Sequence, residues 1–209
     1  MTKSIAEKHG FKATFMPKPI EALTGNGCHA HISAWDKDAK NNKFADKNDE
    51  VGLSELGLNF LGGLMEHATS LVAITNPTVN SFKRINAPRT QSGATWAPNT
   101  ATWSGNNRTH MVRVPAPGRF ELRLPDGAAN PYLLQAVIIA AGIDGINNRT
   151  NPGKRLDIDM YADSQKMRSV KKLPLNLLDA LRVFERNKIL KLSFCLLYTS
   201  DAADDLYRV

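Results

Sequence analysis

The stretch NNRTHMVRVPAPGRFELRLPDGAANPYL, residues 106–133, holds the most informative pattern in this sequence. Apolar and polar residues alternate at 110–114 and again at 119–125, and the turn-forming residues PAPG separate the two runs. An alternation with a period of two predicts a pair of neighbouring strands, each with one buried face. The dipeptide Asn130-Pro131 then combines an N-cap with a first-turn proline, which predicts the start of a long helix.

The segments on either side of this stretch predict further helices and strands. Apolar residues recur at helical spacing over 53–74, and Asn76-Pro77 ends that helix. CHAHISAW, residues 28–35, alternates like a strand after the turn-forming TGNG. We expect other helices at 2–9, 131–147 and 175–187, another strand at 12–16, and polar segments at 36–50 and 81–107. This mixture predicts an α+β domain.

The composition is that of an ordinary globular protein, with 42% hydrophobic and 22% charged residues among 209. The longest apolar run, at 136–143, is far shorter than the roughly 20 residues that cross a bilayer, so no membrane segment is expected. The start, MTKSIAEKHG, lacks an apolar signal core, and two distant cysteines make no disulfide scaffold, which together predict a cytoplasmic protein. The net charge of +7 comes from scattered residues, which favours small acidic ligands over nucleic acid.

Two of the predicted strands carry side chains that are typical of metal and anion sites. His29 and His31 share one strand face, where they would ligate a metal, grip a phosphate or simply lie at the surface. Glu121 shares a face with Arg119 and Arg123, which suits a carboxylate metal ligand flanked by guanidinium groups. The alternative for that strand is an ordinary charged face above a buried apolar one.

Three more arginines lie in or beside the polar parts of the chain: Arg84, Arg108 and Arg113. Convergence of these arginines on the His/Glu pair would create a clamp for phosphate and carboxylate groups. The glycines at 25 and 27 would allow a ligand to approach the backbone closely. Each residue taken singly is a common surface residue, so the interpretation depends on the fold bringing them together.

The order of these motifs resembles one family, the glutamine synthetases of the bacterial class I and type III branch. The matching pieces are FMPKP (15–19), GNGCHAHIS (25–33), NPTVNSFKR (76–84), NNRTHMVRVP (106–115) and RFELRLPDGAANPYL (119–133). The resemblance implies an α+β catalytic domain in which a curved antiparallel sheet, a partial barrel, is flanked by helices. In the family a small N-terminal domain precedes this one.

The resemblance also implies an activity. The family joins ammonia to the side-chain carboxylate of glutamate through a glutamyl phosphate, and ATP is converted to ADP and phosphate. Mg²⁺ or Mn²⁺ would be the metal cofactor, and the intact protein would form a homo-oligomer with active sites between subunits. Neither nucleic acid nor a membrane is an expected partner.

The family's roles can be carried over to nine positions of this sequence. The resemblance implies metal ligands at His29 and Glu121, and ATP contacts at His31, Ser33, Arg108 and Arg113. It implies glutamate contacts at Gly25, Arg84, Arg108 and Arg123. Arg108 and Arg123 are the expected catalytic residues, because positive charge stabilises a transferring phosphoryl group.

One departure from the family bears on the amine. Many members carry a flap glutamate that helps to deprotonate ammonium, but residues 85–103, INAPRTQSGATWAPNTATW, contain no carboxylate. Trp96 and Trp103 would line a pocket for a larger amine or pack in the core. A ligase of glutamate with methylamine or another amine therefore stays open as an alternative, as does a non-catalytic member of the family. A smaller departure is Thr24, where the family commonly has Asn.

We also expect two unequal parts within the chain. Residues 1–193 would form a partial catalytic domain without the small N-terminal domain or the first strand of metal ligands, and this piece would be inactive alone. Residues 195–209, CLLYTSDAADDLYRV, resemble the translation of a transposon-end sequencing adapter, so we interpret 194–209 as read-through. We expect the helical pattern to stop there.

Overall fold

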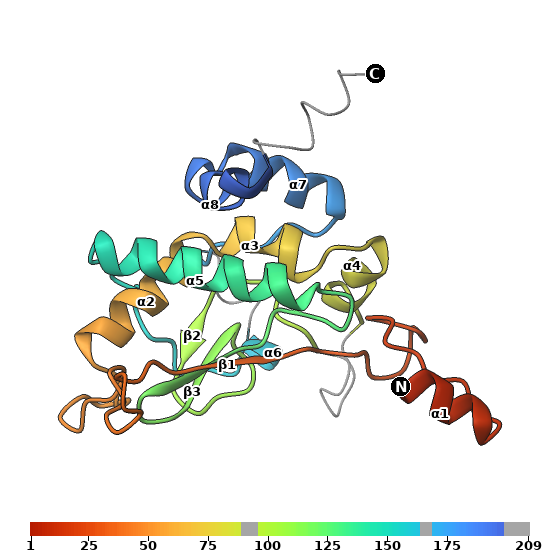
Figure 1. Ribbon diagram of the computed structural model, residues 1–209, viewed down its shortest axis with the longest axis horizontal. Coiled ribbons are helices and arrows are strands. Elements are labelled where there is room, and N and C mark those ends of the chain that lie inside the picture. Colours follow the sequence, from red (N-terminus) through yellow and green to blue (C-terminus); the bar gives the residue numbers. More distant parts are fainter. Residues whose placement is uncertain (89–95, 164–168, 199–209) are drawn as a thin grey trace.

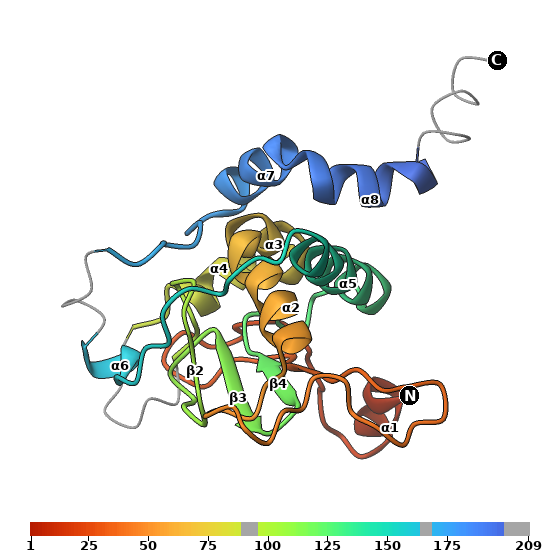
Figure 2. The ribbon, with the colours of Figure 1, turned by 90° about the vertical axis from the view of Figure 1, so that its left-hand side faces the viewer.

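The computed structural model describes residues 1–88, 96–163 and 169–198. In chain order the elements are α1 (Thr2–Lys8), β1 (Ala30–Ile32), α2 (Glu55–Glu66), α3 (Ala68–Thr75), α4 (Val79–Ile85), β2 (Trp103–Ser104), β3 (Val112–Ala116), β4 (Arg119–Leu122), α5 (Pro131–Asn147), α6 (Met160–Asp163), α7 (Leu177–Arg186) and α8 (Lys188–Tyr198). A layer of α2, α3 and α5 covers one face of the sheet, and α7 and α8 lie above that layer (Figures 1 and 2).

The four strands form one open sheet in the order β1-β4-β3-β2. β4 pairs antiparallel with both β1 and β3, whereas β2 runs parallel to β3, so the sheet is mixed rather than wholly antiparallel. The α+β class predicted from the sequence is confirmed. The register places Glu121 of β4 opposite His31 of β1 on one side and Arg113 of β3 on the other. The centre of β4 is therefore where three polar side chains meet.

The apolar face of β4 is anchored by a cluster of three aromatic rings. The ring of Phe120 lies 5.5 Å from Phe44 and 5.7 Å from Phe60, and Phe44 and Phe60 are 5.2 Å apart, measured between centroids. Phe120 and Leu122 are completely buried, as the alternation at 119–125 predicted. Because neighbouring residues of a strand point to opposite faces, burial of these two side chains turns Glu121 away from the helices.

The two central helices α2 and α5 cross with their backbones almost in contact. A Cβ atom at Gly63 would lie 2.0 Å from the carbonyl oxygen of Ala141, and one at Gly142 would lie 2.1 Å from the ring of Phe60. A larger residue would have to displace the backbone of α5 at the first position and the ring of Phe60 at the second. The glycines therefore fix the distance between the two helices that support the sheet.

The single helix expected over 53–74 is wrong, because the chain breaks at His67 into α2 and α3. The buried imidazole of His67 bonds to Asp144 of α5 through Nε2 at 2.8 Å and to Asn187 through Nδ1 at 2.8 Å. These bonds tie the junction to two other helices. The apolar periodicity continues across the break, which is why the sequence pattern did not reveal it.

Other expectations are confirmed at the ends of helices. α1 stops where Gly10 adopts a φ of +76°, and Asn130 caps α5 by accepting the backbone N–H groups of Tyr132 and Leu133. α7 begins after its N-cap Asn176, within the helix expected at 175–187.

Three expectations about local structure are wrong. Residues 12–16 form no strand, because among the described residues no other strand lies beside them, and Met16 instead bonds to Thr14 and Asn26. The strand expected at 28–35 shrinks to the three residues of β1. The polar segment 81–107 contains most of α4, which Thr78 and Ser81 start with a reciprocal capping box.

The end of the chain departs from expectation in one respect. α8 continues through residue 195 to Tyr198, so the helical pattern does not stop at the proposed adapter segment. The remainder of that segment, 199–209, and the middle of the expected flap, 89–95, lie outside the described residues.

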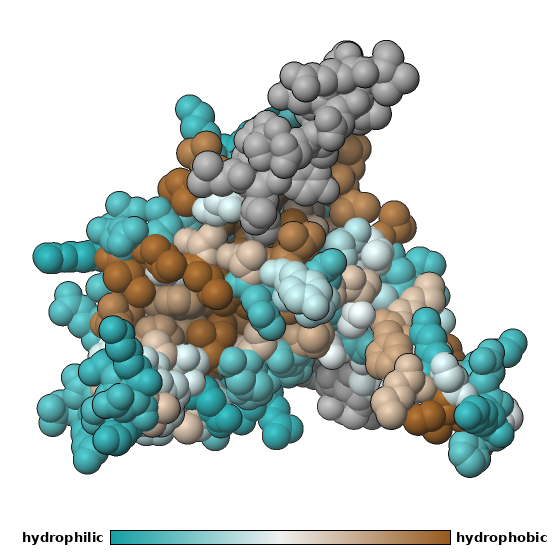
Figure 3. Space-filling view, viewed as in Figure 1, coloured by the Kyte–Doolittle hydropathy of each residue, from teal (hydrophilic) through white to brown (hydrophobic). Residues whose placement is uncertain are grey.

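Large apolar side chains stay exposed on the outer face of α5, among them Tyr132, Ile139 and Ile143. Figure 3 shows hydrophobic surface gathered over this helix. A second group, Phe11, Phe15 and Leu23, is exposed along the extended N-terminal segment. Within the ranges that the structure describes, no helix has both the length and the apolar character needed to cross a membrane.

Candidate active site

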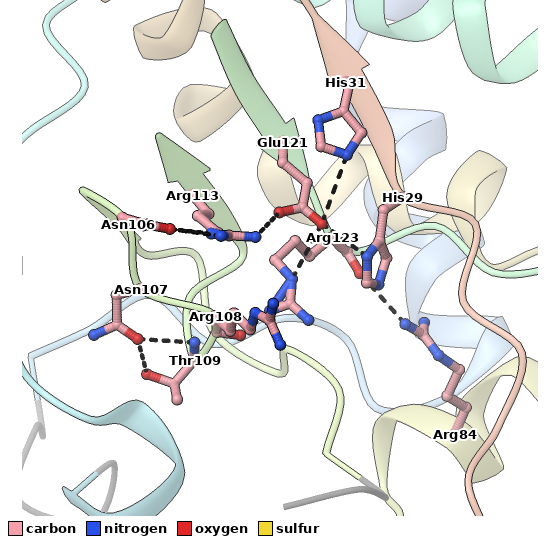
Figure 4. Close-up of polar contacts among 10 residues, drawn as sticks. All are labelled: His29, His31, Arg84, Asn106, Asn107, Arg108, Thr109, Arg113, Glu121 and Arg123. Carbon is pink, nitrogen blue, oxygen red and sulfur yellow. Dashed lines mark hydrogen bonds and ion pairs between the residues drawn. The ribbon is translucent and has the colours of Figure 1, made fainter. Parts of the chain in front are cut away.

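The carboxylate of Glu121 is the centre of a polar cluster on the open face of the sheet (Figure 4). Oε1 lies 2.9 Å from Nδ1 of His29, and Oε2 accepts a hydrogen bond from Nη1 of Arg113 at 3.0 Å. His31 and Arg123 approach the same carboxylate at 4.0 Å and 3.6 Å. Glu121 is only 5% exposed, and the side chains of Arg113 and Arg123 are mostly buried, so the ion pairs of the carboxylate with these two arginines lie largely out of water. The predicted sharing of one face by the two histidines is confirmed.

The charges around Glu121 decide its protonation state. Burial acts to raise the pKa of this carboxyl, but the hydrogen bond from Arg113 and the charge of Arg123 outweigh it and lower the pKa. Burial lowers the pKa of His29, with help from Arg123 and against the attraction of Glu121. At neutral pH the pair is therefore a carboxylate beside a neutral imidazole, which is the state in which both groups bind metals.

The spacing of this pair suits a shared divalent cation. Neighbouring ligands of an octahedral ion with bonds of about 2.1 Å are separated by about 3 Å, close to the 2.9 Å between His29 Nδ1 and Glu121 Oε1. Among the described residues, however, no group of three or more His, Cys, Asp or Glu side chains is placed to hold a metal. The two residues fit a metal in kind and spacing, but they make only part of a coordination shell.

Arg113 is held in place from two sides. Its Nη1 donates to Glu121, while its Nε and Nη2 donate to Oδ1 of Asn106 at 2.8 and 2.5 Å. Asn106 belongs to the loop that follows β2, and sequence reasoning assigned it no role. With three of its nitrogens directed by carboxylate and amide oxygens, Arg113 is aligned beside the site rather than free in solvent.

Arg108 and Arg123 are linked through the backbone. Nη1 of Arg123 donates to the carbonyl oxygen of Arg108, whose own side chain is exposed. The guanidinium of Arg123 also lies 5.9 Å from the ring centroid of Trp96, within the range of a cation–π interaction. Within the described residues, the buried Nε of Arg123 makes no hydrogen bond. Trp96 therefore contacts an arginine of the site, whereas Trp103 is buried and donates to Gly153, as a core residue would.

Arg84 reaches the cluster from α4. It is 6% exposed and donates to the carbonyl oxygens of Leu124 at 2.9 Å and Arg123 at 3.3 Å. Burial lowers the pKa of this guanidinium, partly offset by the nearby carboxylate of Asp126. Asp126 is itself fully buried and accepts from Asn76 at 2.8 Å. The sequence offers no signal for Asp126 as a countercharge, because only the fold brings it near Arg84.

The two glycines of the predicted site pack against it. A Cβ at Gly27 would lie 2.9 Å from Nε2 of His29 and 3.1 Å from Nη2 of Arg84. A Cβ at Gly25 would lie 2.4 Å from the carbonyl oxygen of Pro17 and 3.5 Å from the side chain of Arg84. Gly25 therefore needs glycine for close packing against the backbone, whereas a side chain at Gly27 would displace the side chains of His29 and Arg84. The glutamate contact expected at Gly25 stays a prediction.

Ser33 is the predicted site residue that the structure leaves outside this cluster. It is exposed beyond the end of β1, and its hydroxyl oxygen accepts from the indole of Trp35 at 3.0 Å. The expected ATP contact of Ser33 stays a prediction. The other side chains come together as Figure 4 shows, with the two histidines and Arg113 at the carboxylate and Arg84 and Arg108 linked through Arg123.

Known proteins resemble this chain over nearly its whole length. The family described as "Glutamine synthetase, catalytic domain" matches residues 1–198. A glutamine synthetase of Rhizobium leguminosarum bv. phaseoli is 69% identical over 191 residues, which are 91% of this chain and 44% of the relative. A glutamate–methylamine ligase of Methyloversatilis universalis is 44% identical over 192 residues, which are 90% and 43% of the two chains.

A solved structure resembles the fold equally well. The complex of GmaS with ADP, in its first conformation, superposes with a TM-score of 0.84 and 53% identity, covering 99% of this chain and 49% of that one. The chain thus spans somewhat less than half the length of the curated relatives it matches.

Proposed function

The chain belongs to the glutamine synthetase family, and from that premise we propose that the intact protein is a glutamate–ammonia ligase. In the proposed reaction the γ-phosphoryl group of ATP passes to a side-chain oxygen of glutamate, and ADP leaves. Ammonia then attacks the acyl carbon, the attacking nitrogen loses a proton, and the bond between the acyl carbon and the phosphate oxygen breaks to release phosphate. The products are glutamine, ADP and phosphate.

The observation that carries this proposal is the convergence of Arg113 and Arg123 on the His29–Glu121 pair, with Arg108 next to Arg123. A transferring phosphoryl group spreads negative charge over three oxygens, and catalysis depends on positioning and neutralising it. We assign phosphate neutralisation to Arg108 and Arg113. Arg123 would orient the carboxylate of glutamate and, with Arg108, stabilise the transferring group.

His29 and Glu121 would hold Mg²⁺ or Mn²⁺ in the intact protein. A divalent ion at this place would neutralise nucleotide phosphates. The presence of ADP in the GmaS complex supports nucleotide binding by this fold, and we assign His31 and Ser33 to that role. Arg84 and the backbone at Gly25 would complete the glutamate side.

The incomplete coordination shell supports a second part of the proposal. Because the described residues place no third His, Cys, Asp or Glu ligand beside His29 and Glu121, we propose that the chain does not turn over substrates by itself. The exposed apolar faces of α5 and of residues 11–23 support coverage by the rest of the intact protein or by neighbouring subunits. A homo-oligomer with shared active sites agrees with both observations.

A second candidate function is ligation of methylamine or another amine to glutamate. The segment 85–103 contains no carboxylate that would deprotonate ammonium, and the chain resembles both GmaS and a glutamate–methylamine ligase. The higher identity to the rhizobial glutamine synthetase favours ammonia as the first candidate.

ADP release by the intact protein tests both candidates. The protein would receive glutamate, Mg-ATP and either ammonium or methylamine at matched concentrations, and Glu121→Gln would show whether turnover depends on this site. Ammonium-dependent release that disappears in the variant supports the first proposal. Faster ADP release with methylamine than with ammonium would favour the second candidate function. No ADP release with either amine would contradict both candidate functions and leave a non-catalytic role.

A further inference from the structure

The loop at 106–110 makes contacts on two sides, one toward the active site and one away from it. Toward the active site, the amide oxygen of Asn106 aligns Arg113, and the carbonyl oxygen of Arg108 accepts from Arg123. The intervening residues, Asn107 and Thr109, turn the other way, as Figure 4 shows. One short loop therefore sets the positions of three arginines, and what anchors the loop decides how precisely they are held.

The outer side of the loop is bonded to a segment far away in the chain. Nδ2 of Asn107 donates to the carbonyl oxygen of Ile158 at 2.9 Å, and the backbone N–H of Met160 donates to Oγ1 of Thr109 at 2.9 Å. The hydroxyl of Thr109 in turn donates to Oδ1 of Asn107 at 2.8 Å. These bonds close a ring in which the Thr109 hydroxyl both donates and accepts.

The distant segment is itself fixed. Asp157 accepts from Ser104 of β2 at 2.9 Å, the imidazole of His110 bonds to the carbonyl oxygen of Ile158 at 3.0 Å, and Met160 is 2% exposed. Residues 157–160 thus form a supporting segment that connects the loop to the sheet and to the core. Few alternative positions remain for the backbone of Arg108.

We infer that Asn107 and Thr109 are positioning residues. By bonding the loop to this supporting segment, they hold Arg108 and Arg123 in place. The inference rests on the proposed function, since it assigns the arginines to substrate phosphate and carboxylate. Displacement of a catalytic group by about 1 Å can cost on the order of a hundredfold in rate. A loop with one exposed arginine needs an external anchor to avoid such displacement, and Asn107 and Thr109 supply it.

Two substitutions in the intact protein test the anchor. Thr109→Val keeps the shape of the side chain but removes the hydroxyl, and Thr109→Ser restores it. Asn107→Asp keeps the oxygen that accepts from Thr109 but loses the donor to Ile158. The matched control is Asn42→Asp, because Nδ2 of Asn42 likewise donates to a distant carbonyl, Gly118, at 3.0 Å, and its Oδ1 accepts the N–H of Phe44 at 2.9 Å.

The readouts are kcat, the KM values for glutamate and ATP, the melting temperature, and hydrogen exchange of 106–112 and 157–160. We expect Thr109→Val and Asn107→Asp to lower kcat/KM for glutamate by about tenfold or more. Both segments should exchange faster, Thr109→Ser should recover most of the loss, and the melting temperature should fall no further than in Asn42→Asp.

Equal losses of activity in the variants and in Asn42→Asp would overturn the inference, as would failure of serine to restore activity. If the unsubstituted protein releases no ADP, the proposed function fails, and hydrogen exchange then decides the anchor alone. Faster exchange in both segments of the variants supports it, and unchanged exchange contradicts it.

Discussion

Nδ1 of His29 and Oε1 of Glu121 lie 2.9 Å apart, on two chain segments that the sheet brings together by antiparallel pairing. The separation is close to the roughly 3 Å between neighbouring ligands of one octahedral ion. His29→Ala removes one of them, so we expect the concentration of Mn²⁺ needed for half-maximal binding to rise by about tenfold or more. Electron paramagnetic resonance of Mn²⁺ with the intact protein measures the bound fraction directly, without requiring turnover.

The control for this prediction is His9→Ala, since His9 is exposed at the end of α1. It should leave Mn²⁺ binding unchanged. Unaltered Mn²⁺ affinity in a well-folded His29→Ala protein would rule out His29 as a ligand.

The ring of Trp96 lies 5.9 Å from the guanidinium carbon of Arg123, and cation–π contacts contribute about 0.5–2 kcal/mol. Trp96→Leu should therefore raise the KM for glutamate by about two- to thirtyfold, while Trp96→Phe, which keeps a π face, should have a smaller effect. Steady-state ADP release by the intact protein measures both. Identical KM values for the leucine and phenylalanine variants would show that the ring face does not matter.

Gly25 lies against a rigid part of the backbone. Its new Cβ in Gly25→Ala would lie 2.4 Å from the carbonyl oxygen of Pro17, which already accepts the N–H of Asn26 at 2.8 Å. We expect a loss of about 1–3 kcal/mol in the free energy of unfolding, measured by urea denaturation. Gly105→Ala is the comparison, because the nearest atom to its Cβ is 4.0 Å away. Equal stability of the two variants would contradict the close packing at Gly25.

Burial holds the pKa of His110 below its ordinary value of 6.5, although the carbonyl of Ile158 and the carboxylates of Asp157 and Asp159 oppose this shift. The unfolded chain therefore takes up the proton first as the pH falls. Stability should decrease from about pH 6.5 down to the lowered pKa of the folded state, by about 1.4 kcal/mol for each unit of pKa difference.

Urea denaturation at pH 7.5, 6.5 and 5.5 tests this expectation in the wild-type protein and in His110→Gln. The variant should lose less stability across that range, while His9→Gln, at an exposed position, should follow the wild type. His29 acts in the same direction, so the difference between variants is the quantity to compare. Parallel pH profiles for wild type and His110→Gln would contradict a buried neutral imidazole.

Much of the fold and of the site was predictable because their determinants are local. The alternation at 119–125 placed Phe120 in the core and Glu121 on the open face, and the asparagine–proline pair at 130 and 131 marked the start of α5. The pairing of His29 with Glu121 followed from the motif order rather than from any physical rule of distance.

The parts that were missed depend on distant contacts. The break at His67 is set by Asp144 and Asn187, whose positions no periodicity reveals. The strand expected at 12–16 has suitable residues but no partner strand beside it among the described ranges. Asn106 looks like any loop asparagine until the fold brings Arg113 to it.

Two arginines of this site are held by main-chain carbonyl oxygens: those of Leu124 and Arg123 hold Arg84, and that of Arg108 holds Arg123. Every amino acid carries such an oxygen, so substitution at the accepting positions leaves the acceptor in place. Alanine scanning would thus register the donors and overlook their acceptors. Chemical replacement of single peptide bonds by esters makes the carbonyl a poorer acceptor, and it would therefore reveal how much these carbonyl oxygens contribute to holding the arginines.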